Sequence, residues 1–226
     1  NGVSDWVPLQ SNLIATLHVN FVGELDEEGT LTGQLTLNRG GYNASNKRAA
    51  MDGFNSLEEY FEDYEKKLAH MSIAKPSVEN RENCEMLLGE KMNIEVTNFA
   101  IMDQEEIHFN PVVYGKTDRN PFNLATRTYP VDIGSKLQEN MTFTIRVPEG
   151  YTLNQESLES KLNMALPNRD ARFVFNVSQD GAVVTAQVLM QINKPLFLPE
   201  EYFDLKEFFS RIIQAEKVSL TLRKKA

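Results

Sequence analysis

The sequence predicts an α+β fold that is mainly β, with two antiparallel β-sheet or sandwich-like units that each carry a packed helix. Three observations favour this class. Apolar and polar residues alternate over several stretches, which is typical of strands with one buried face. Turns that contain Gly or Pro separate these stretches. Two other segments space their apolar residues three and four apart, which indicates the buried face of a helix.

The first predicted unit, residues 1–135, opens with a β-hairpin. Apolar residues alternate over residues 13–21 and again over residues 31–37. The acidic run 26–28 between them ends at Gly29, and Gly readily adopts the positive φ that short hairpin loops require. Acidic residues could also hold calcium, but the alternating oxygen ligands of an EF-hand are absent. We therefore interpret the acidic run as a turn.

A helical insertion is expected over about residues 43–71. From Phe54 to Met71 the apolar residues recur at intervals of three and four, which places them on one helix face. Ser56 and Glu59 form the capping box that satisfies free backbone amides at a helix start. Packing of this face onto a sheet is the preferred interpretation, because the repeat is short for a coiled coil.

Strands are predicted again between about residues 91 and 113, where apolar residues recur in a β pattern. The segment 118–130 that follows is rich in turn residues. Its Asn-Pro and Tyr-Pro steps disfavour helix at the residue before each proline. We therefore expect a domain boundary near Ser135.

The second predicted unit, residues 136–226, is a small antiparallel β domain with one C-terminal helix. Alternation predicts its main strands at residues 141–147, 171–177 and 182–192, and a last strand at 218–222. Between them, a broad apolar helix face covers about residues 199–215, with Pro199 well placed as a first helical residue.

Charge and composition exclude several classes of function. The formal net charge is −9, and a strongly negative protein repels phosphate backbones, so nucleic-acid binding is not expected. No apolar run approaches the roughly 20 residues that span a bilayer, so membrane insertion is not expected. Cys84 is the single cysteine, which leaves no internal disulfide. The chain starts at Asn1 without Met or a leader, so we expect a fragment of a larger protein.

The sharpest enzymatic hypothesis is a thiol triad. Cys84, His108 and Asp118 follow each other in the order used by papain-like and transglutaminase-like enzymes. A catalytic thiol needs a lowered pKa, usually from a helix N-terminus and a nearby imidazole. Glu82 and Glu85 flank Cys84 instead, and negative neighbours disfavour a thiolate. We therefore predict no catalytic residue in this chain.

No metal or cofactor site is predicted either. The three histidines, His18, His70 and His108, lack the close spacing of metal ligands. Paired carboxylates are found at Glu58-Glu59, Glu62-Asp63, Glu105-Glu106 and Glu200-Glu201. Most of them fit solvated helix faces or first helical turns, where the helix dipole favours negative charge. Glycine-rich phosphate and dinucleotide motifs are absent.

A ligand-binding module is the main alternative to a structural role. Trp6, Phe122, Tyr129 and Tyr151 lie in turn-rich segments, where exposed aromatic rings could stack on sugars or peptides. The competing interpretation is that these rings close the ends of a β core. The first hypothesis predicts that the rings lie together on a concave, exposed surface.

Several short motifs resemble one family when they are taken together in this order. They are Gly29-x-Leu31-x-Gly33, Gly41-Tyr42-x-Ala44 with Arg48, Asn120-Pro121-Phe122 with Arg127, Tyr129-Pro130-Val131-Asp132, Val147-Pro148-Glu149-Gly150-Tyr151, and Glu200-Glu201-Tyr202 through Phe208-Phe209. The chain is thereby similar to the C-terminal region of exported transglutaminase-like proteins of Bacteroides-type bacteria. This region is a domain of unknown function that follows the transglutaminase-like core.

The resemblance implies a non-catalytic accessory region. The family's catalytic residues lie in the upstream core, which would be the partner of this region within the same polypeptide. The resemblance also implies export to the periplasm or the cell surface, while a glycan, peptide or cell-envelope polymer is the alternative partner. For the motif residues Tyr42, Arg48, Asn120, Phe122, Arg127 and Asp132 we expect structural roles. If the Tyr42–Arg48 and Asn120–Arg127 motifs meet in space, the arginines should hold loops in place through hydrogen bonds to backbone carbonyl groups.

Overall fold

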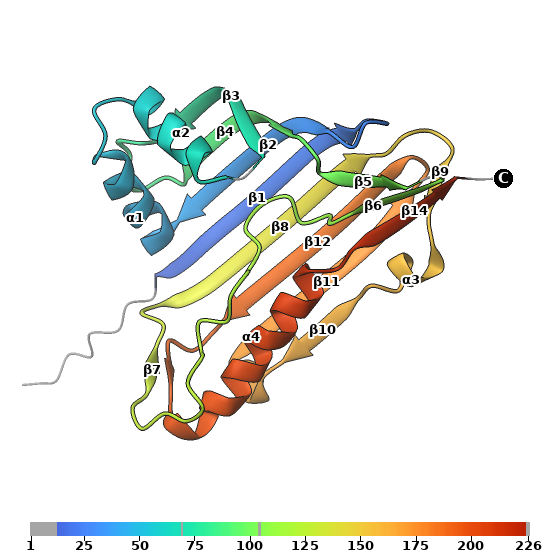
Figure 1. Cartoon of the computed structure of the whole chain (residues 1–226). Helices are drawn as coiled ribbons and strands as arrows, with labels where there is room; N and C mark the ends of the chain where they lie inside the picture. The colour runs from blue at the N-terminus through green and yellow to red at the C-terminus, as the bar shows by residue number, and fades with distance from the viewer. Residues whose placement is uncertain (1–12, 69, 104, 225–226) are drawn as a thin grey trace, which may run out of the picture.

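The computed structural model of the chain describes residues 13–68, 70–103 and 105–224. Its main feature is an eight-stranded mixed sheet with the strand order β10-β11-β12-β8-β1-β2-β4-β3 (Figure 1). The strands are β1 (Ile14–Leu25), β2 (Leu31–Gly40), β3 (Met71–Glu79), β4 (Leu88–Val96), β8 (Lys136–Arg146), β10 (Leu162–Ala165), β11 (Ala171–Asp180) and β12 (Val183–Ile192). The mainly β, α+β class predicted from the sequence is confirmed.

The strands of the two predicted units form one sheet instead of two antiparallel sheets. β1 and β8 pair in parallel, with Val19 opposite Met141 and Phe21 opposite Phe143. The sheet is therefore mixed, because the neighbouring pairs of strands are antiparallel. Alternation defines the buried face of a strand but not its neighbour, which is why this pairing was not predicted. The division of the chain near Ser135 stays a prediction, although strands from both sides of it share the sheet.

Two smaller sheets and four helices complete the described fold. The four-stranded sheet has the order β5 (Ala100–Asp103), β6 (Glu106–Phe109), β14 (Leu220–Lys224) and β9 (Tyr151–Leu153). The two-stranded sheet joins β13 (Leu196–Phe197) to β7 (Val131–Asp132). The helices are α1 (Gly41–Met51), α2 (Leu57–Lys66), α3 (Gln155–Leu158) and α4 (Tyr202–Glu216), with 3-10 turns at Pro167–Arg169 and Pro199–Glu201.

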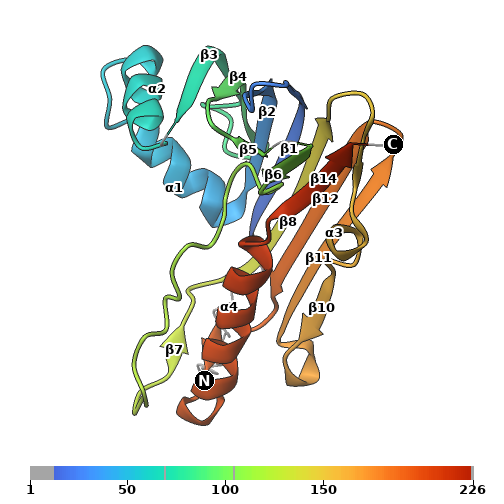
Figure 2. The same ribbon diagram turned by 45° about the vertical axis from the view of Figure 1, so that its right-hand side comes forward.

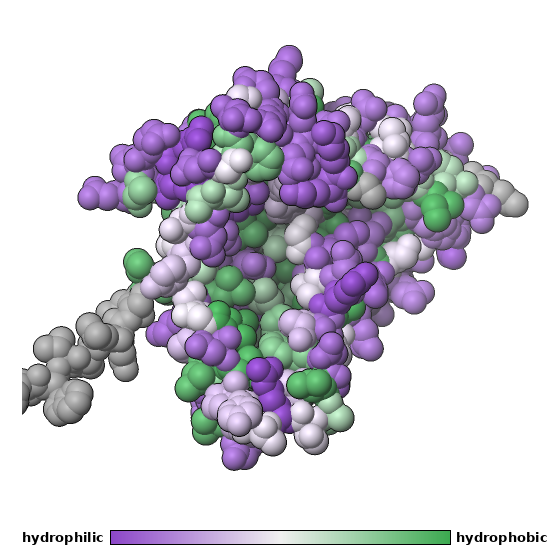
Figure 3. Space-filling model, turned by 60° about the vertical axis from the view of Figure 1, so that its left-hand side comes forward, coloured by the Kyte–Doolittle hydropathy of each residue, from purple (hydrophilic) through white to green (hydrophobic). Residues whose placement is uncertain are grey.

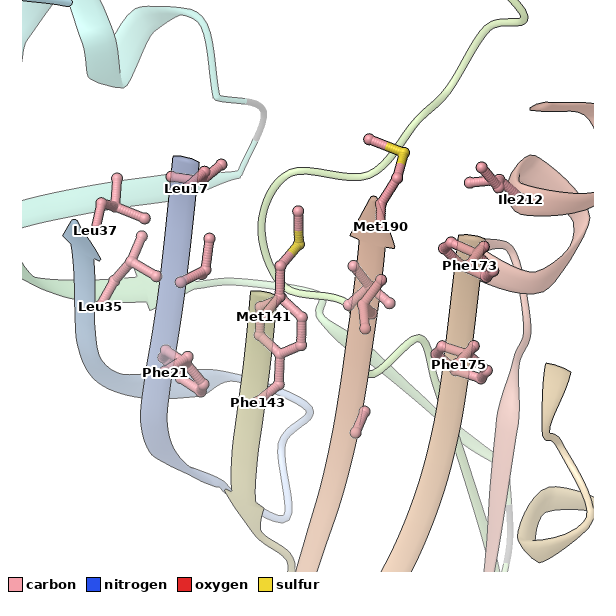
Figure 4. Packing of buried hydrophobic residues seen from close by; sticks show 14 of the residues in the cluster. Leu17, Phe21, Leu35, Leu37, Met141, Phe143, Phe173, Phe175, Met190 and Ile212 are labelled. Atoms are coloured by element: carbon pink, nitrogen blue, oxygen red, sulfur yellow. The ribbon is translucent and has the colours of Figure 1, made fainter. Parts of the chain in front are cut away.

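One face of the large sheet is apolar and carries the core. In Figure 3, hydrophobic residues (green) gather in a hollow below the more hydrophilic upper part of the molecule. Phe21, Phe143 and Phe173 point to this face and are fully buried, whereas His18 and Asn20 on the opposite face are exposed. Figure 4 shows Phe21 and Phe143 on the neighbouring strands β1 and β8, and Phe173 on β11, beyond β12, with Ile212 of α4 close to Phe173. In Figures 1 and 2, α1 and α2 lie at one end of the sheet and α4 runs along the other part. None of the described helices is long and apolar enough to cross a membrane.

The predicted hairpin is confirmed as β1 and β2. Gly29 has a φ of +85°, and the Asp26 carboxylate accepts hydrogen bonds from the Glu28 and Thr30 amides within the turn. The acidic run is therefore part of the turn itself. The C-terminal helix predicted over residues 199–215 is also confirmed, as the 3-10 turn that starts at Pro199 followed by α4.

The helical insertion is confirmed but is shorter than predicted. Ser56 caps α2 by accepting a hydrogen bond from the Glu59 amide, as the capping box requires. Met71, which we placed on the helix, instead begins β3. This strand is an edge strand with a register shift between Ala74 and Ser77. Most of its residues are exposed, so it lacks the alternation from which a strand is predicted.

Candidate functional site

A groove beside α1 gathers several of the residues selected from the sequence. It encloses about 810 Å³ between the start of α1 and the segment 84–87. We call it the α1 groove; its lining residues are Leu13, Gly40, Gly41, Tyr42, Ala44, Ser45, Arg48, Ala49, Asp52, Cys84, Glu85, Met86 and Leu87. Four of them are exposed apolar or aromatic side chains, namely Leu13, Tyr42, Met86 and Leu87, which are 41–57% exposed. Exposed apolar surface gathered in this way is typical of a contact site.

The Gly40-Gly41 pair makes the turn from β2 into α1 that forms one side of the groove. Gly41 has a φ of +57°, and a Cβ atom there would lie 2.3 Å from the carbonyl oxygen of Ile14. A larger residue would strain the backbone and collide with β1. α1 can therefore start close to the end of the sheet, with Tyr42 on the groove side.

Arg48 holds the other side of the groove in place. Its Nε donates a hydrogen bond to the Arg81 carbonyl at 2.9 Å. Its Nη2 donates to the carbonyl groups of Asn80, Asn83 and Met86 at 2.8–3.0 Å. Arg48 is buried, with 8% of its surface exposed. A single guanidinium group thus joins α1 to a loop of bends and turns that has no helix or strand structure of its own.

A second set of polar groups lies buried between α2 and the sheet. Arg39 of β2 forms an ion pair with Glu90 of β4, and both side chains are buried. The Tyr60 hydroxyl donates to the other oxygen of Glu90 at 2.8 Å. Arg39 also donates to the Tyr114 hydroxyl at 3.2 Å, and this hydroxyl is hydrogen-bonded to that of Tyr64. We call these residues the Arg39–Glu90 cluster; its groups are paired with one another, as buried charges require.

Lys47 of α1 covers the Arg39–Glu90 cluster. Its ammonium group lies 3.9 Å from Glu90 and over the rings of Tyr60 and Tyr64, at 5.0 and 4.3 Å from their centroids. Burial and the positive charge of Arg39 lower the pKa of Lys47 to about 8. Burial raises the pKa of Tyr60 to about 12. The cluster therefore connects α1, α2, β2 and β4 around one carboxylate.

The Arg39–Glu90 cluster was not found from the sequence, although a signal for it exists. Arg39 follows Leu35 and Leu37 in the alternation of β2, and Glu90 precedes Met92 in the same way. A charged residue at an apolar position of a strand indicates a buried ion pair. Pairing the two residues requires the register of β2 and β4, in which Leu37 lies opposite Glu90.

Two carboxylates also lie on or near the apolar face of the sheet. Glu139 of β8 lies between Leu17 of β1 and Met190 of β12. Burial raises the pKa of Glu139 to about 7, and the charge of Glu216 adds to the shift. Burial also raises the pKa of Glu216, against the effect of a hydrogen bond from the Thr117 amide at 2.7 Å.

We expect the stability of the protein to fall as pH rises from about 4.5 to about 7. In this window the unfolded chain loses the Glu139 proton while the folded chain retains it, so deprotonation favours unfolding. Glu139→Gln should weaken this dependence, leaving the part that Glu216 contributes, and raise the free energy of unfolding at pH 8 by about 2 kcal/mol. Urea unfolding at pH 5 and pH 8 measures the effect. Glu95→Gln, at an exposed position of β4, is the control and should leave the pH dependence unchanged. If the stability of Glu139→Gln changes with pH as that of the unaltered chain does, the prediction is wrong.

The structure does not assemble the thiol triad considered from the sequence. Cys84 is exposed in the α1 groove. His108 lies on β6, where its Nδ1 is 3.1 Å from the Thr221 hydroxyl and its Nε2 is 3.4 Å from Glu106. Asp118 lies near Glu216, at the end of α4. The three residues therefore lie in three different surroundings. Their order in the sequence matches that of a triad, but order alone does not bring side chains together.

Asn120 and Phe122 fix the turn-rich segment onto α4. The Asn120 side chain donates to the Lys206 carbonyl and the Ser210 hydroxyl, both at 2.9 Å, and accepts from the Phe122 amide. Phe122 is only 6% exposed and packs edge-on against Tyr202 and Phe209. The hypothesis that Phe122 faces a ligand is therefore wrong. Burial of a large aromatic side chain against an apolar helix face is favourable in free energy, because it removes apolar surface from water.

Within the described residues, no three His, Cys, Asp or Glu side chains form a group that could hold a metal ion.

Comparison with known proteins gives a family but no function. Residues 105–222 match the family described as "Domain of Unknown Function with solved-structure structure (DUF3858)", which is about half of the chain. The chain belongs to the DUF3858 family. No curated protein matches it.

A solved structure that is similar to this DUF3858 chain is that of a "putative protease" from Parabacteroides distasonis ATCC 8503. The two share 20% sequence identity over 45% of this chain, with a TM-score of 0.39. The match covers 19% of that protein's length. At this level of similarity the comparison says nothing about activity.

The remaining residues selected from the motifs lie in loops and in the short strands β7 and β9. Arg127 lies over the ring of Tyr202, 6.0 Å from its centroid, and the Asp132 carboxylate accepts from the Gly134 amide at 2.8 Å. Tyr129 is 77% exposed next to β7, whereas Tyr151 is half-buried at the start of β9. Figure 1 shows β7 and β9 at opposite ends of the molecule. These aromatic residues thus form no common surface, and Trp6 lies outside the described residues.

Proposed function

We propose that the chain is a non-catalytic accessory region that packs on the catalytic core of a larger exported protein through the α1 groove. The observation that carries the proposal is the exposed apolar rim of this groove. Leu13, Met86 and Leu87 are each about half exposed or more around one depression. Burial of such side chains against a partner is favourable by about 25 cal/mol per Å² of apolar surface removed from water.

The α1 groove is also held in shape before any partner binds. Arg48 ties the segment 80–86 to α1, and Gly41 lets α1 start close to β1. A surface that is already ordered loses less conformational entropy on binding than a mobile loop does. This supports a stable packing contact over a transient one.

The position of Leu13 favours a partner on the same polypeptide. Leu13 lines the groove, so residues that precede it in the chain are attached at the groove itself. A domain joined there would meet the groove at a high effective concentration. The motif resemblance gives this domain a transglutaminase-like identity and a position upstream, in an exported protein. The accessory region would then stabilise the core and shape access to its cleft.

The charged groups near the groove support a structural role for this region. Arg48 bonds to backbone carbonyl groups, and Glu90 is shared by Arg39, Lys47 and Tyr60. Groups that are bound in this way stabilise the fold and are not available to a substrate. We therefore assign the chemistry of the whole protein to the core.

Alkylation of Cys84 gives a direct test, because its thiol is exposed in the α1 groove. We expect the 226-residue chain alone to react with iodoacetamide as an exposed thiol does. In a polypeptide that also carries the core, the rate should fall by about tenfold or more, because the core covers the groove. The double variant Met86→Gln/Leu87→Gln, which adds no charge beside the thiol, should restore the reaction and lower the melting temperature of the core.

Val22→Gln is the matched control, since Val22 is exposed and apolar but lies on β1 away from the groove. It should change neither the rate nor the melting temperature. The proposal fails if Cys84 reacts equally fast in both polypeptides. It also fails if the core alone has the melting temperature and turnover of the longer protein.

A further inference from the structure

The two edges of the large sheet differ in how well they could accept another strand. The β3 edge is interrupted by a register shift, and it carries Lys75 with a φ of +49° followed by Pro76. Such features prevent strands from pairing edge to edge. β10 forms the other edge and has neither a proline nor a bulge within its four residues. Figure 2 shows β10 at the rim of the sheet beside β11.

Two residues of β10 direct their backbone N–H and C=O groups away from the sheet. Leu166, which follows β10, donates its amide to the Ala171 carbonyl of the neighbouring chain segment at 2.9 Å. In antiparallel pairs, successive residues direct their backbone groups alternately toward and away from the neighbour. Leu162 and Met164 thus bond toward β11, while the N–H and C=O groups of Asn163 and Ala165 point outward. A strand added at this edge would form hydrogen bonds with these outward backbone groups.

A groove runs between the β10 edge and α4. We call it the β10 groove; it has two hollows of about 590 and 290 Å³ that both include Glu207 and Arg211. The apolar residues Leu162, Met164 and Leu166 line it from the sheet side. All three are half-buried, so they still have apolar surface to lose to a partner.

We propose that the chain forms a two-fold dimer in which the β10 strands of two copies pair in antiparallel fashion, with Met164 opposite Met164. In this register Asn163 of one copy exchanges both backbone hydrogen bonds with Ala165 of the other. The large sheets of the two copies become one continuous sheet. Strand addition of this kind uses main-chain bonds for affinity and side chains for specificity.

The side chains on the groove face of β10 fit this register. Leu162 of each copy lies opposite Leu166 of the other, and the two Met164 side chains meet on the two-fold axis. The β10 residues that face each other on the groove side, from Leu162 to Leu166, are therefore all apolar, which stabilises antiparallel strands. Met adapts its shape to such a contact more easily than branched residues do.

The charges at the two ends of the β10 groove are complementary as well. Lys161 lies at the Leu162 end, and Asp204 lies at the end that Leu166 and Pro167 line. The two-fold axis brings Lys161 of one copy to Pro167 of the other, next to Asp204 of that copy. A surface that carries opposite charges on its two ends in this way fits a second copy of itself.

The dimer is tested by sedimentation equilibrium of the 226-residue chain over a range of concentrations. We expect the mass to rise from 25.7 kDa towards twice this value. Lys161→Asp and Asp204→Lys should each raise the dimer dissociation constant by about tenfold, through like charges at the interface. The double variant restores opposite charges and should return it to within about threefold of the original.

Ala165→Pro removes an outward amide that the fold itself does not use, and should also weaken the dimer. Ser72→Asp, on the exposed β3 edge, is the control and should leave the dimer unchanged. Circular dichroism checks that each variant is folded. A chain that stays at 25.7 kDa at every concentration would overturn the proposal. So would a double charge variant that is no better than the single ones. The outcome does not depend on the α1 groove, which shares no residue with this surface.

Discussion

Replacing Arg48 with alanine is expected to lower the free energy of unfolding by about 2–3 kcal/mol. The change removes four hydrogen bonds between a charged donor and the backbone of the segment 80–86. Hydrogen bonds to charged groups contribute about 1.5–3 kcal/mol each, but water can replace part of them because this segment is near the surface. The net loss is therefore smaller than the sum. Urea unfolding at pH 7 measures it.

Arg48→Lys separates the effect of charge from that of geometry. Lysine keeps the positive charge but lacks the planar guanidinium group, which bonds to four backbone carbonyl groups at once. We expect it to recover less than half of the loss. Arg172→Ala, at an exposed position of β11, is the control and should change the stability by about 0.5 kcal/mol or less. If Arg48→Ala unfolds at the urea concentration of the unaltered chain, Arg48 does not hold the groove.

The regular elements could be predicted wherever a strand or helix has one buried face. β1, β2, β8, β11 and β12 alternate over most of their length, and α4 has a continuous apolar side. β3 could not be predicted, because it is an exposed edge strand. β10 shows only the short alternation of Leu162, Met164 and Leu166, too brief to distinguish from a loop. The parallel pairing of β1 with β8 joins residues more than a hundred positions apart, and no local pattern encodes it.

The candidate site was predictable in part for the same reason. Arg48 was selected from the motif around Gly41, and its bonding to carbonyl groups was expected, but the segment that it holds was not. The groove itself arises from long-range packing of α1 against residues 84–87. The Arg39–Glu90 cluster depends on the register of two strands and on a helix placed over them. Periodicity identifies the buried positions, while tertiary structure decides which of them meet.

Replacing Glu90 with alanine should have the largest effect of any single change considered, a loss of about 3–5 kcal/mol. The carboxylate is fully buried and is shared by Arg39, Lys47 and the Tyr60 hydroxyl. Its removal leaves a buried guanidinium group and a partly buried ammonium group without this negative partner. An unpaired buried charge is more costly than the absence of the whole pair.

This asymmetry makes a double-mutant cycle decisive. Arg39→Met/Glu90→Met should be more stable than the sum of the single changes predicts, by about 2 kcal/mol, because both charges leave together and apolar side chains fill the space. Lys47 limits the recovery, since its ammonium group stays near the site. Glu95→Ala, at an exposed position of the same strand, is the control for loss of a carboxylate from β4. Additive effects would mean that Arg39 and Glu90 stabilise the fold independently, and that the cluster does not act as a unit that joins α1 and α2 to the sheet.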